Sequence, residues 1–312
     1  MNKVLILLVV ILGSVSVACN QKKGPERTDT TTSGVATVIC DDCFSPILRE
    51  EANVFQSMNG DATIKLRFAN EVDALNLLFK DSVRLIVAAR DLTPVEKKAL
   101  QDKKMLPRSA KIAVDGIALI INKSNKDTLI TVDEFRRILS GKIRTWGDLR
   151  PGSSRGTIDV IFDNANSSTV RYVQDSVSKG KFLSKNIYAK ENNQAVLDYV
   201  SKTPNALGII GVNWVSNPDD STKLTFIDKI RVMSVSPYEV ADADNSFAPV
   251  PAYLMLERYP FFRYIYMIIT DAPGYLPSGF MNFVGGDRGQ RIILKSGLVP
   301  STRPMRLVNI HE

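Results

Sequence analysis

The chain has 312 residues, of which 44% are hydrophobic and 23% charged, which is typical of a globular protein with one large or two ordinary domains. The only histidine is His311, which argues against a Ser-His-Asp triad, a histidine metal site and histidine acid–base catalysis. Three cysteines are too few for a disulfide-stapled scaffold. The net charge of +7 comes from 40 basic and 33 acidic residues that are interspersed, so it strongly favours neither nucleic acid nor an anionic ligand.

Residues 1–18 are predicted to form a secretory signal, because the basic Lys3 precedes an apolar run and then small residues. The run is too short to remain as a membrane span. Cys19 follows directly and resembles the lipobox of bacterial lipoproteins, in which this cysteine carries the lipid; the alternative is an ordinary signal with a chance cysteine. Polar residues 19–34 are expected to form a flexible tether. These features predict a lipid-anchored protein on the periplasmic or surface side of a bacterial cell envelope.

The rest of the chain alternates between predicted strands and predicted helices. Apolar or alternating runs predict strands at residues 35–39, 64–68, 84–89, 157–162 and 207–212, and the apolar run at residues 111–121 is too long for one plain strand. Helical spacing predicts helices at residues 46–58, 72–79, 93–103, 131–139, 169–178 and 193–201. Capping signals support two of the helices: Thr93 stands before Pro94, and Thr131 stands three residues before Glu134. Such alternation is typical of an α/β protein with mostly parallel sheets, whose ligands bind beyond the carboxyl ends of strands.

Cys40 and Cys43 form a C-x-x-C pair just before the first helix. One such pair offers too few ligands for a structural zinc ion. In an exported protein the two cysteines could form a small-loop disulfide, stay as two free thiols, or act in redox chemistry, because a helix N-terminus lowers the pKa of a thiol. The sequence leaves these three alternatives open.

Several motifs occur in an order that resembles one family. They are DGIA at residues 115–118, SGKIRTW at residues 140–146, LGIIG at residues 207–211, RYPFFRYIY at residues 258–266, and a C-terminal stretch from GF at 279–280 through GQ at 289–290 to GLVP at 297–300. Each is moderately specific, but the ordered set over residues 35–300 is similar to the phosphate-binding proteins of ABC transporters.

This resemblance implies a periplasmic-binding-protein fold of type II: two α/β domains with mostly parallel sheets, joined by two crossover segments. Domain I would comprise residues 35–115 and 250–312, and domain II residues 116–249. The first crossover is expected where Asp115-Gly116 interrupts the long apolar run at 111–121, and the return at residues 236–251. Two crossings allow hinge closure on a ligand, because only a few residues change their dihedral angles.

Three loop-to-helix junctions are candidate parts of the binding site. Cys43-Phe44 resembles the family's Thr/Ser-Phe loop, Asn70 opens the second helix, and Ser167-Ser168-Thr169 resembles its "SGT" phosphate loop. Free backbone N–H groups, hydroxyl donors and the helix dipole could together hold an oxyanion. The alternative is that these residues only cap their helices.

The chain also departs from the family pattern. Asp163 stands where the family commonly has an arginine, Asn70-Glu71 replaces a serine-rich loop, and Ala89 lies near the family's proton-accepting aspartate. A carboxylate that faces a dianion repels it unless it is protonated or paired with a cation. Arg90 and Arg171 are the candidate cations, and each could equally be a solvated charge on a helix.

The sequence thus predicts a solute-binding protein that makes and breaks no bond and needs no cofactor or metal. It would capture a small oxyanion, above all phosphate, for an ABC permease. A second hypothesis is a non-transport surface or sensor protein that reuses the fold for another ligand, which the cleft carboxylates favour. A third is a thiol–disulfide enzyme based on Cys40 and Cys43.

Overall fold

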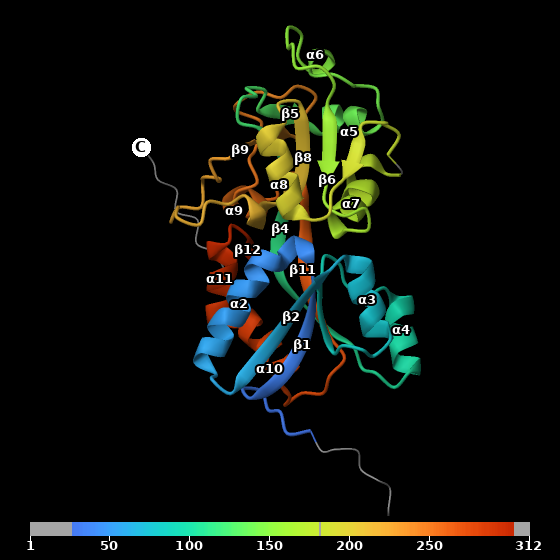
Figure 1. The fold of residues 1–312 in the computed structure, drawn as a ribbon, viewed down its shortest axis with the longest axis vertical. Coiled ribbons are helices and arrows are strands. Elements are labelled where there is room, and N and C mark those ends of the chain that lie inside the picture. Colours follow the sequence, from blue (N-terminus) through green and yellow to red (C-terminus); the bar gives the residue numbers. More distant parts are fainter. Residues whose placement is uncertain (1–26, 181, 303–312) are drawn as a thin grey trace, which may run out of the picture.

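The computed structural model describes residues 27–180 and 182–302, which form two α/β lobes stacked along the long axis of the molecule (Figure 1). Their strands build two sheets that share one long strand, β4 (Arg108–Asn122). The expected alternation of strands and helices is confirmed. Within the described ranges, no helix is both long and apolar enough to cross a membrane.

The lower lobe in Figure 1 contains a sheet in the order β2-β1-β3-β11-β4, in which β1 is parallel to its neighbours and β11 antiparallel to its own. Its other strands are β1 (Gly34–Asp41), β2 (Ala62–Ala69), β3 (Leu85–Ala88), β11 (Phe262–Ile269) and β12 (Val299–Pro300). One face is covered by α2 (Ser45–Met58), α10 (Leu276–Gly285) and α11 (Asp287–Lys295), and the other by α3 (Glu71–Phe79) and α4 (Pro94–Asp102). The alternating side chains of β1 explain the two faces, because Val38 and Cys40 pack on the α2 side and Ile39 on the α3 side.

The upper lobe contains a sheet in the order β4-β8-β6-β7, with a further strand, β9, on β4. Its strands are β6 (Asp159–Phe162), β7 (Ile187–Ala189), β8 (Ala206–Gly211) and β9 (Ile230–Val232), and β5 (Leu129–Thr131) and β10 (Ser234–Ser236) form a small separate pair. The helices are α5 (Val132–Leu139), α6 (Trp146–Leu149), α7 (Ser168–Tyr172), α8 (Asn193–Lys202) and α9 (Pro251–Met255). A short turn, η4 (Val212–Trp214), follows β8, and another, η2 (Asp42–Phe44), follows β1 of the lower lobe. The helix expected at 169–178 is α7 followed by a π-helical segment, η3 (Val173–Ser178).

The chain passes between the lobes along β4 and β11. β4 pairs with β11 as far as Gly116 and with β8 from Ile117 onward, so the chain passes from one lobe to the other at the expected place. The expected interruption at Asp115-Gly116 is wrong, because the strand is continuous and only changes its partner there. Residues 236–247 do not carry the return, because Val235 pairs with Phe247 and the segment comes back to the same place. The lobes are thus joined by paired strands with a regular hydrogen-bond ladder.

The first described residues are docked against the lower lobe. Arg27 forms ion pairs with Asp29 and Asp271, and the backbone N–H of Leu276 donates to Asp29. From Arg27 on, this segment therefore differs from the flexible tether that we expected through residue 34. Cys19 lies outside the described residues.

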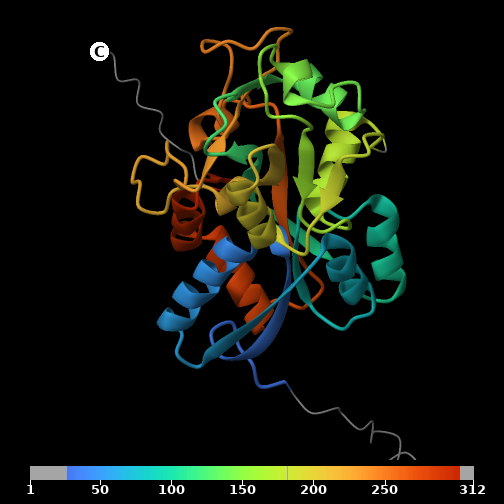
Figure 2. The same cartoon turned by 45° about the horizontal axis from the view of Figure 1, so that its top comes forward.

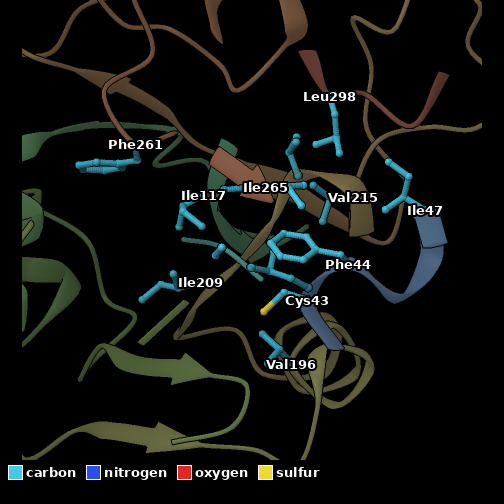
Figure 3. Packing of buried hydrophobic residues seen from close by; sticks show 14 of the residues in the cluster. Cys43, Phe44, Ile47, Ile117, Val196, Ile209, Val215, Phe261, Ile265 and Leu298 are labelled. Atoms are coloured by element: carbon cyan, nitrogen blue, oxygen red, sulfur yellow. The ribbon is translucent and has the colours of Figure 1, made fainter. Parts of the chain in front are cut away.

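One hydrophobic cluster runs through the junction of the lobes. Phe44 and Ile47 of the lower lobe pack in it together with Ile117, Val196 and Val215 (Figure 3). All five side chains are buried. Because this packing continues from lobe to lobe, it fixes the ends of β1 and β6 beside each other.

Candidate functional site

Most of the predicted site residues meet where the two lobes join. The carboxyl end of β1 leads into η2 with Asp41 and Cys43, and the carboxyl end of β6 leads into the loop from Asp163 to Thr169. This placement follows the expectation that polar groups gather beyond the carboxyl ends of parallel strands. We call the buried polar residues at this point the junction cluster: Asp41, Cys43, Asp115, Asp163, Ser167, Ser168, Thr169, Asn193 and Arg263.

Arg263 of β11 is the cation at the centre of the junction cluster. Its Nε donates to Asp115 Oδ2 at 3.0 Å, and its Nη1 donates to Ser168 Oγ at 2.8 Å and Thr169 Oγ1 at 3.4 Å. Its Nη2 has no hydrogen-bond partner among the described residues. Burial acts to lower the pKa of Arg263, but Asp115 and the other acids around it raise this pKa above its usual value. The guanidinium therefore stays charged, and its buried Nη2 keeps donors that no described residue uses.

Asp115 anchors Arg263 on the neighbouring strand β4. Its Oδ1 accepts from the backbone N–H of Val212 at 3.2 Å. Burial raises the pKa of this carboxyl, and Arg263 opposes the shift. A Cβ atom on Gly211 would lie 3.1 Å from Asp115 Oδ2 and 3.0 Å from Asn213 Nδ2, so this glycine allows the close approach of the backbone to the ion pair.

Asp163 is 2% exposed and accepts three hydrogen bonds from different parts of the chain. Ser167 Oγ donates to Oδ1 at 2.6 Å, and Cys43 Sγ and Asn193 Nδ2 each lie 3.3 Å from Oδ2. Burial raises the pKa of Asp163 to about 6, and the charge of Asp41 adds to this effect against the hydrogen bond from Ser167. Asp163, which departs from the family pattern, is thus a buried carboxylate at the junction of the lobes.

The three hydroxyl residues of the β6–α7 loop are buried and have more than one role. Ser167 caps α7 by accepting from the N–H of Val170 at 3.2 Å, so the capping alternative holds for this residue. Thr169 Oγ1 lies 3.2 Å from Cys43 Sγ, and Ser168 Oγ lies 3.5 Å from the same sulfur. The loop therefore presents its hydroxyls to the opposite lobe as well as to its own helix.

Cys43 and Phe44 contribute buried side chains to the junction. The N–H of Cys43 donates to Asp41 Oδ1 at 3.0 Å, and its carbonyl accepts from Asn213 Nδ2 at 3.0 Å and Trp214 Nε1 at 2.9 Å. The Phe44 ring lies in the apolar cluster of Figure 3, with the Arg263 guanidinium 4.8 Å from its centroid. The expected donor at the backbone of Cys43 is thus already bound within the protein.

The remaining predicted residues lie at the edge of the cluster or outside it. Arg90 forms a two-pronged ion pair with Glu96, at 2.7 and 2.8 Å, and its Nε lies 3.9 Å from Glu71 Oε1. Arg171 of α7 reaches across the lobes to Glu71 of α3, with 2.5 Å between Nε and Oε1, and the two helices lie beside each other in Figure 1 and Figure 2. Asn70 caps α3 by accepting from the N–H of Asp73 at 2.9 Å.

A cavity of about 400 Å³ opens beside Asp163 and includes Asn70 and Ser167 in its lining. Five carboxyl residues border it: Asp41, Asp42, Asp73, Asp163 and Glu191. A larger cavity of about 530 Å³ between α2 and α11 touches none of the predicted site residues. In the part of the chain that the structure describes, no three His, Cys, Asp or Glu side chains are grouped so that they could hold a metal ion.

Cys40 and Cys43 are both free and buried. Burial raises the pKa of each thiol well above its ordinary value, and nearby aspartates add to the shift. Because the thiolate is the reactive form, this environment suppresses the nucleophilic chemistry that a redox motif requires. The geometry therefore favours two structural thiols over the disulfide and redox alternatives.

Arg263 was absent from the site residues predicted from sequence, although it lies in the RYPFFRYIY motif. A signal for it exists in the alternation of β11, because Arg263 shares the inward face of the strand with Ile265 and Met267. A charged residue on a buried strand face requires a partner or a ligand. Asn193, at the start of α8, carried no comparable local signal.

The comparisons with known proteins agree with this fold. The family model of the PBP (periplasmic-binding-protein) superfamily domain matches residues 25–288. The phosphate-binding protein PstS of Staphylococcus saprophyticus is 24% identical over 90% of this chain and 83% of its own length. The PstS of Staphylococcus aureus is 26% identical over 79% of this chain and 72% of its own length. Among solved structures, one from Clostridium perfringens with bound phosphate has a TM-score of 0.69 at 22% identity, covering 86% of this chain and 100% of its own. An ABC-type phosphate transport receptor from Vibrio cholerae has a TM-score of 0.63 at 15% identity, with the same coverage. The chain belongs to the PBP superfamily.

Proposed function

We propose that this protein is an extracytoplasmic solute-binding protein that holds a small oxyanion, with phosphate as the first candidate, between its lobes for an ABC permease. The observation that carries the proposal is Arg263: it is buried, it contacts the hydroxyls of Ser168 and Thr169, and its Nη2 is unpartnered among the described residues. The phosphate-binding relatives support the choice of ligand.

The chemistry of the junction cluster suits such a ligand. A guanidinium recognises the oxygens of phosphate through its planar set of donors, and neutral hydroxyls add hydrogen bonds without further charge. Ser168 and Thr169 lie on the upper lobe and Cys43 on the lower lobe, so a bound anion would touch both. Because these side chains are buried, water is excluded from the contacts, which strengthens them.

The test is a calorimetric titration of the mature protein with phosphate and with sulfate. We expect Thr169→Val, which keeps the shape of the side chain and removes its hydroxyl, to weaken binding by about tenfold to a hundredfold, because a hydrogen bond to a charged group contributes about 1.5–3 kcal/mol. Thr93→Ala is the matched control: it removes a capping hydroxyl from α4, away from the junction cluster. The control should lower stability by about 1 kcal/mol and leave affinity unchanged.

The double variant Ser167→Ala, Thr169→Ala separates binding from capping. Ser167 does both, so the double variant should lose affinity and also some stability. A lowered melting temperature with full affinity would show that these hydroxyls only cap α7, and it would overturn the proposed site.

The proposal includes a lipid anchor at Cys19 that places the protein on the outer side of a bacterial membrane. It is supported by the signal-like residues 1–18, and it needs a covalent test because Cys19 lies outside the described residues. Cys19→Ser should yield an unprocessed or soluble protein that carries no labelled palmitate. If this variant still fractionates with membranes and carries the label, the anchor is wrong.

A second candidate function is a surface or sensor protein with a ligand other than phosphate. The observation that favours it is the row of five carboxyl residues around the cavity beside Asp163. If phosphate and sulfate both fail to bind while a small cationic or carboxylic solute binds, this candidate takes the place of the first.

A further inference from the structure

The junction cluster already contains an oxyanion, because the Asp163 carboxylate occupies the donors that an anionic ligand would use. Ser167 donates to one of its oxygens at 2.6 Å, and Cys43 and Asn193 lie 3.3 Å from the other. Cys43 Sγ is in turn 3.2 Å from Thr169 Oγ1. The two lobes are therefore bridged here by the protein's own carboxylate.

The charges around this point leave little room for a second anion. Three buried carboxyl groups, those of Asp41, Asp115 and Asp163, surround Arg263 as the one buried guanidinium of the cluster, within the described chain. Asp115 already pairs with this guanidinium at 3.0 Å. A dianion that entered beside an ionised Asp163 would meet like charge in a region screened poorly by water.

We propose that Asp163 is a built-in competitor for the oxyanion site, so that the protein takes up an anion only when Asp163 binds a proton. This inference rests on the proposed function and adds a regulation to it. Protonation removes the charge of Asp163 and converts one of its oxygens from an acceptor to a donor, which can face the ligand. The hydroxyl of Ser167 is then released for the anion.

Several elements bring titratable or charged groups to face Asp163, and those in closest contact set the pH at which this exchange occurs. The lower lobe contributes Asp41, Asp42 and Cys43, and β11 contributes Arg263. Asn193 at the start of α8 and Glu191 just before it lie on the upper lobe, and Asp73 lies across the cavity. Burial, followed by the charge of Asp41, holds the pKa of Asp163 at about 6 against the hydrogen bonds of Ser167 and Cys43 and the charge of Arg263. Asp163 is thus neutral below this pH and ionised above it, so anion binding should tighten as the pH falls.

The experiment is calorimetry with sulfate and phosphate at pH about 5.5 and about 8. Sulfate is the decisive probe because its charge does not change over this range, whereas phosphate gains a proton. The wild type should bind sulfate at least about tenfold more tightly at the lower pH. Asp163→Asn should bind it equally at both pH values, and at least about tenfold more tightly than the wild type at the higher pH.

Glu191→Gln is the matched control, since it removes a carboxylate from the same cavity at an exposed position. It should keep the pH dependence of the wild type. Wild-type sulfate binding that is tight and independent of pH, or weaker binding by Asp163→Asn, would overturn the inference and leave the proposed function intact. If neither protein binds either anion at either pH, the proposed function fails together with the inference.

Discussion

The ion pair of Arg263 and Asp115 should be the most sensitive point of the junction, and Arg263→Met is the variant that tests it. Methionine retains most of the apolar stem and removes the guanidinium. The change would leave Asp115 buried without its cation and would deprive Ser168 and Thr169 of the Nη1 donor. Both strands that join the lobes lose a contact at the same point, because Asp115 lies on β4 and Arg263 on β11.

The expected cost follows from the burial of both partners. Removing one member of a buried ion pair destabilises a protein by about 3–5 kcal/mol, because the other charge stays in a medium of low polarity. The whole stability of a domain is only about 5–15 kcal/mol. With a shift of about 2–4 °C for each kcal/mol in a chain of this size class, the melting temperature should fall by about 6–20 °C.

Thermal and urea unfolding of the wild type and three variants decide the question. The control is Arg67→Met, which removes an exposed arginine from strand β2 and should change stability by less than about 0.5 kcal/mol. The double variant Asp115→Leu, Arg263→Met removes both charges and should recover part of the loss. If Arg263→Met melts with the wild type, the pair contributes no stability and its place in this account is wrong.

Three further predictions concern the other buried groups. The pKa of Asp163 is raised to about 6, so protonation of this carboxyl favours the native state. The free energy of unfolding of the wild type should therefore fall by about 3 kcal/mol as the pH rises from 4 through 6. Asp163→Asn should remove this part of the pH dependence of urea unfolding, and an unchanged dependence would contradict the prediction. Arg171→Met breaks the contact with Glu71 between α7 and α3, so small-angle scattering should show a larger radius of gyration than for the wild type, and an equal radius would mean that the pair does not hold the lobes together. Cys40 and Cys43 are buried thiols of raised pKa, so a thiol reagent should label them only after unfolding; fast labelling of the native protein would refute their burial.

The local structure was largely predictable because its causes are local. Thr131 forms the capping box with Glu134 that its spacing indicated, and Thr93, expected as an N-cap, caps its helix and forms a box with Glu96. Apolar alternation likewise placed strands such as β1 close to their observed bounds. These features depend on residues within one or two turns of each other, so the sequence pattern contains them.

The contacts of the site depend on distant parts of the chain, and the sequence alone could not supply them. Cys43 and Asp163 are 120 positions apart, and Asp115 and Arg263 are 148 apart. The sequence named Asp163 as a departure from the family pattern, but only the packing of the lobes shows that its carboxylate accepts the hydroxyl of Ser167. Arg90, by contrast, was expected near the ligand and pairs with Glu96 because the two lie close along the chain.

The central claim is that a small oxyanion binds between the lobes at Arg263 and Thr169. The most direct test is a crystal structure of the protein grown at acid pH with arsenate, an analogue of phosphate that its anomalous scattering locates without ambiguity. We expect an anomalous peak within hydrogen-bond distance of Thr169 Oγ1 and Arg263 Nη2, with the Ser167 hydroxyl turned from Asp163 toward the anion. A saturated crystal whose arsenate lies elsewhere, with the contacts of Asp163 unchanged, would contradict it.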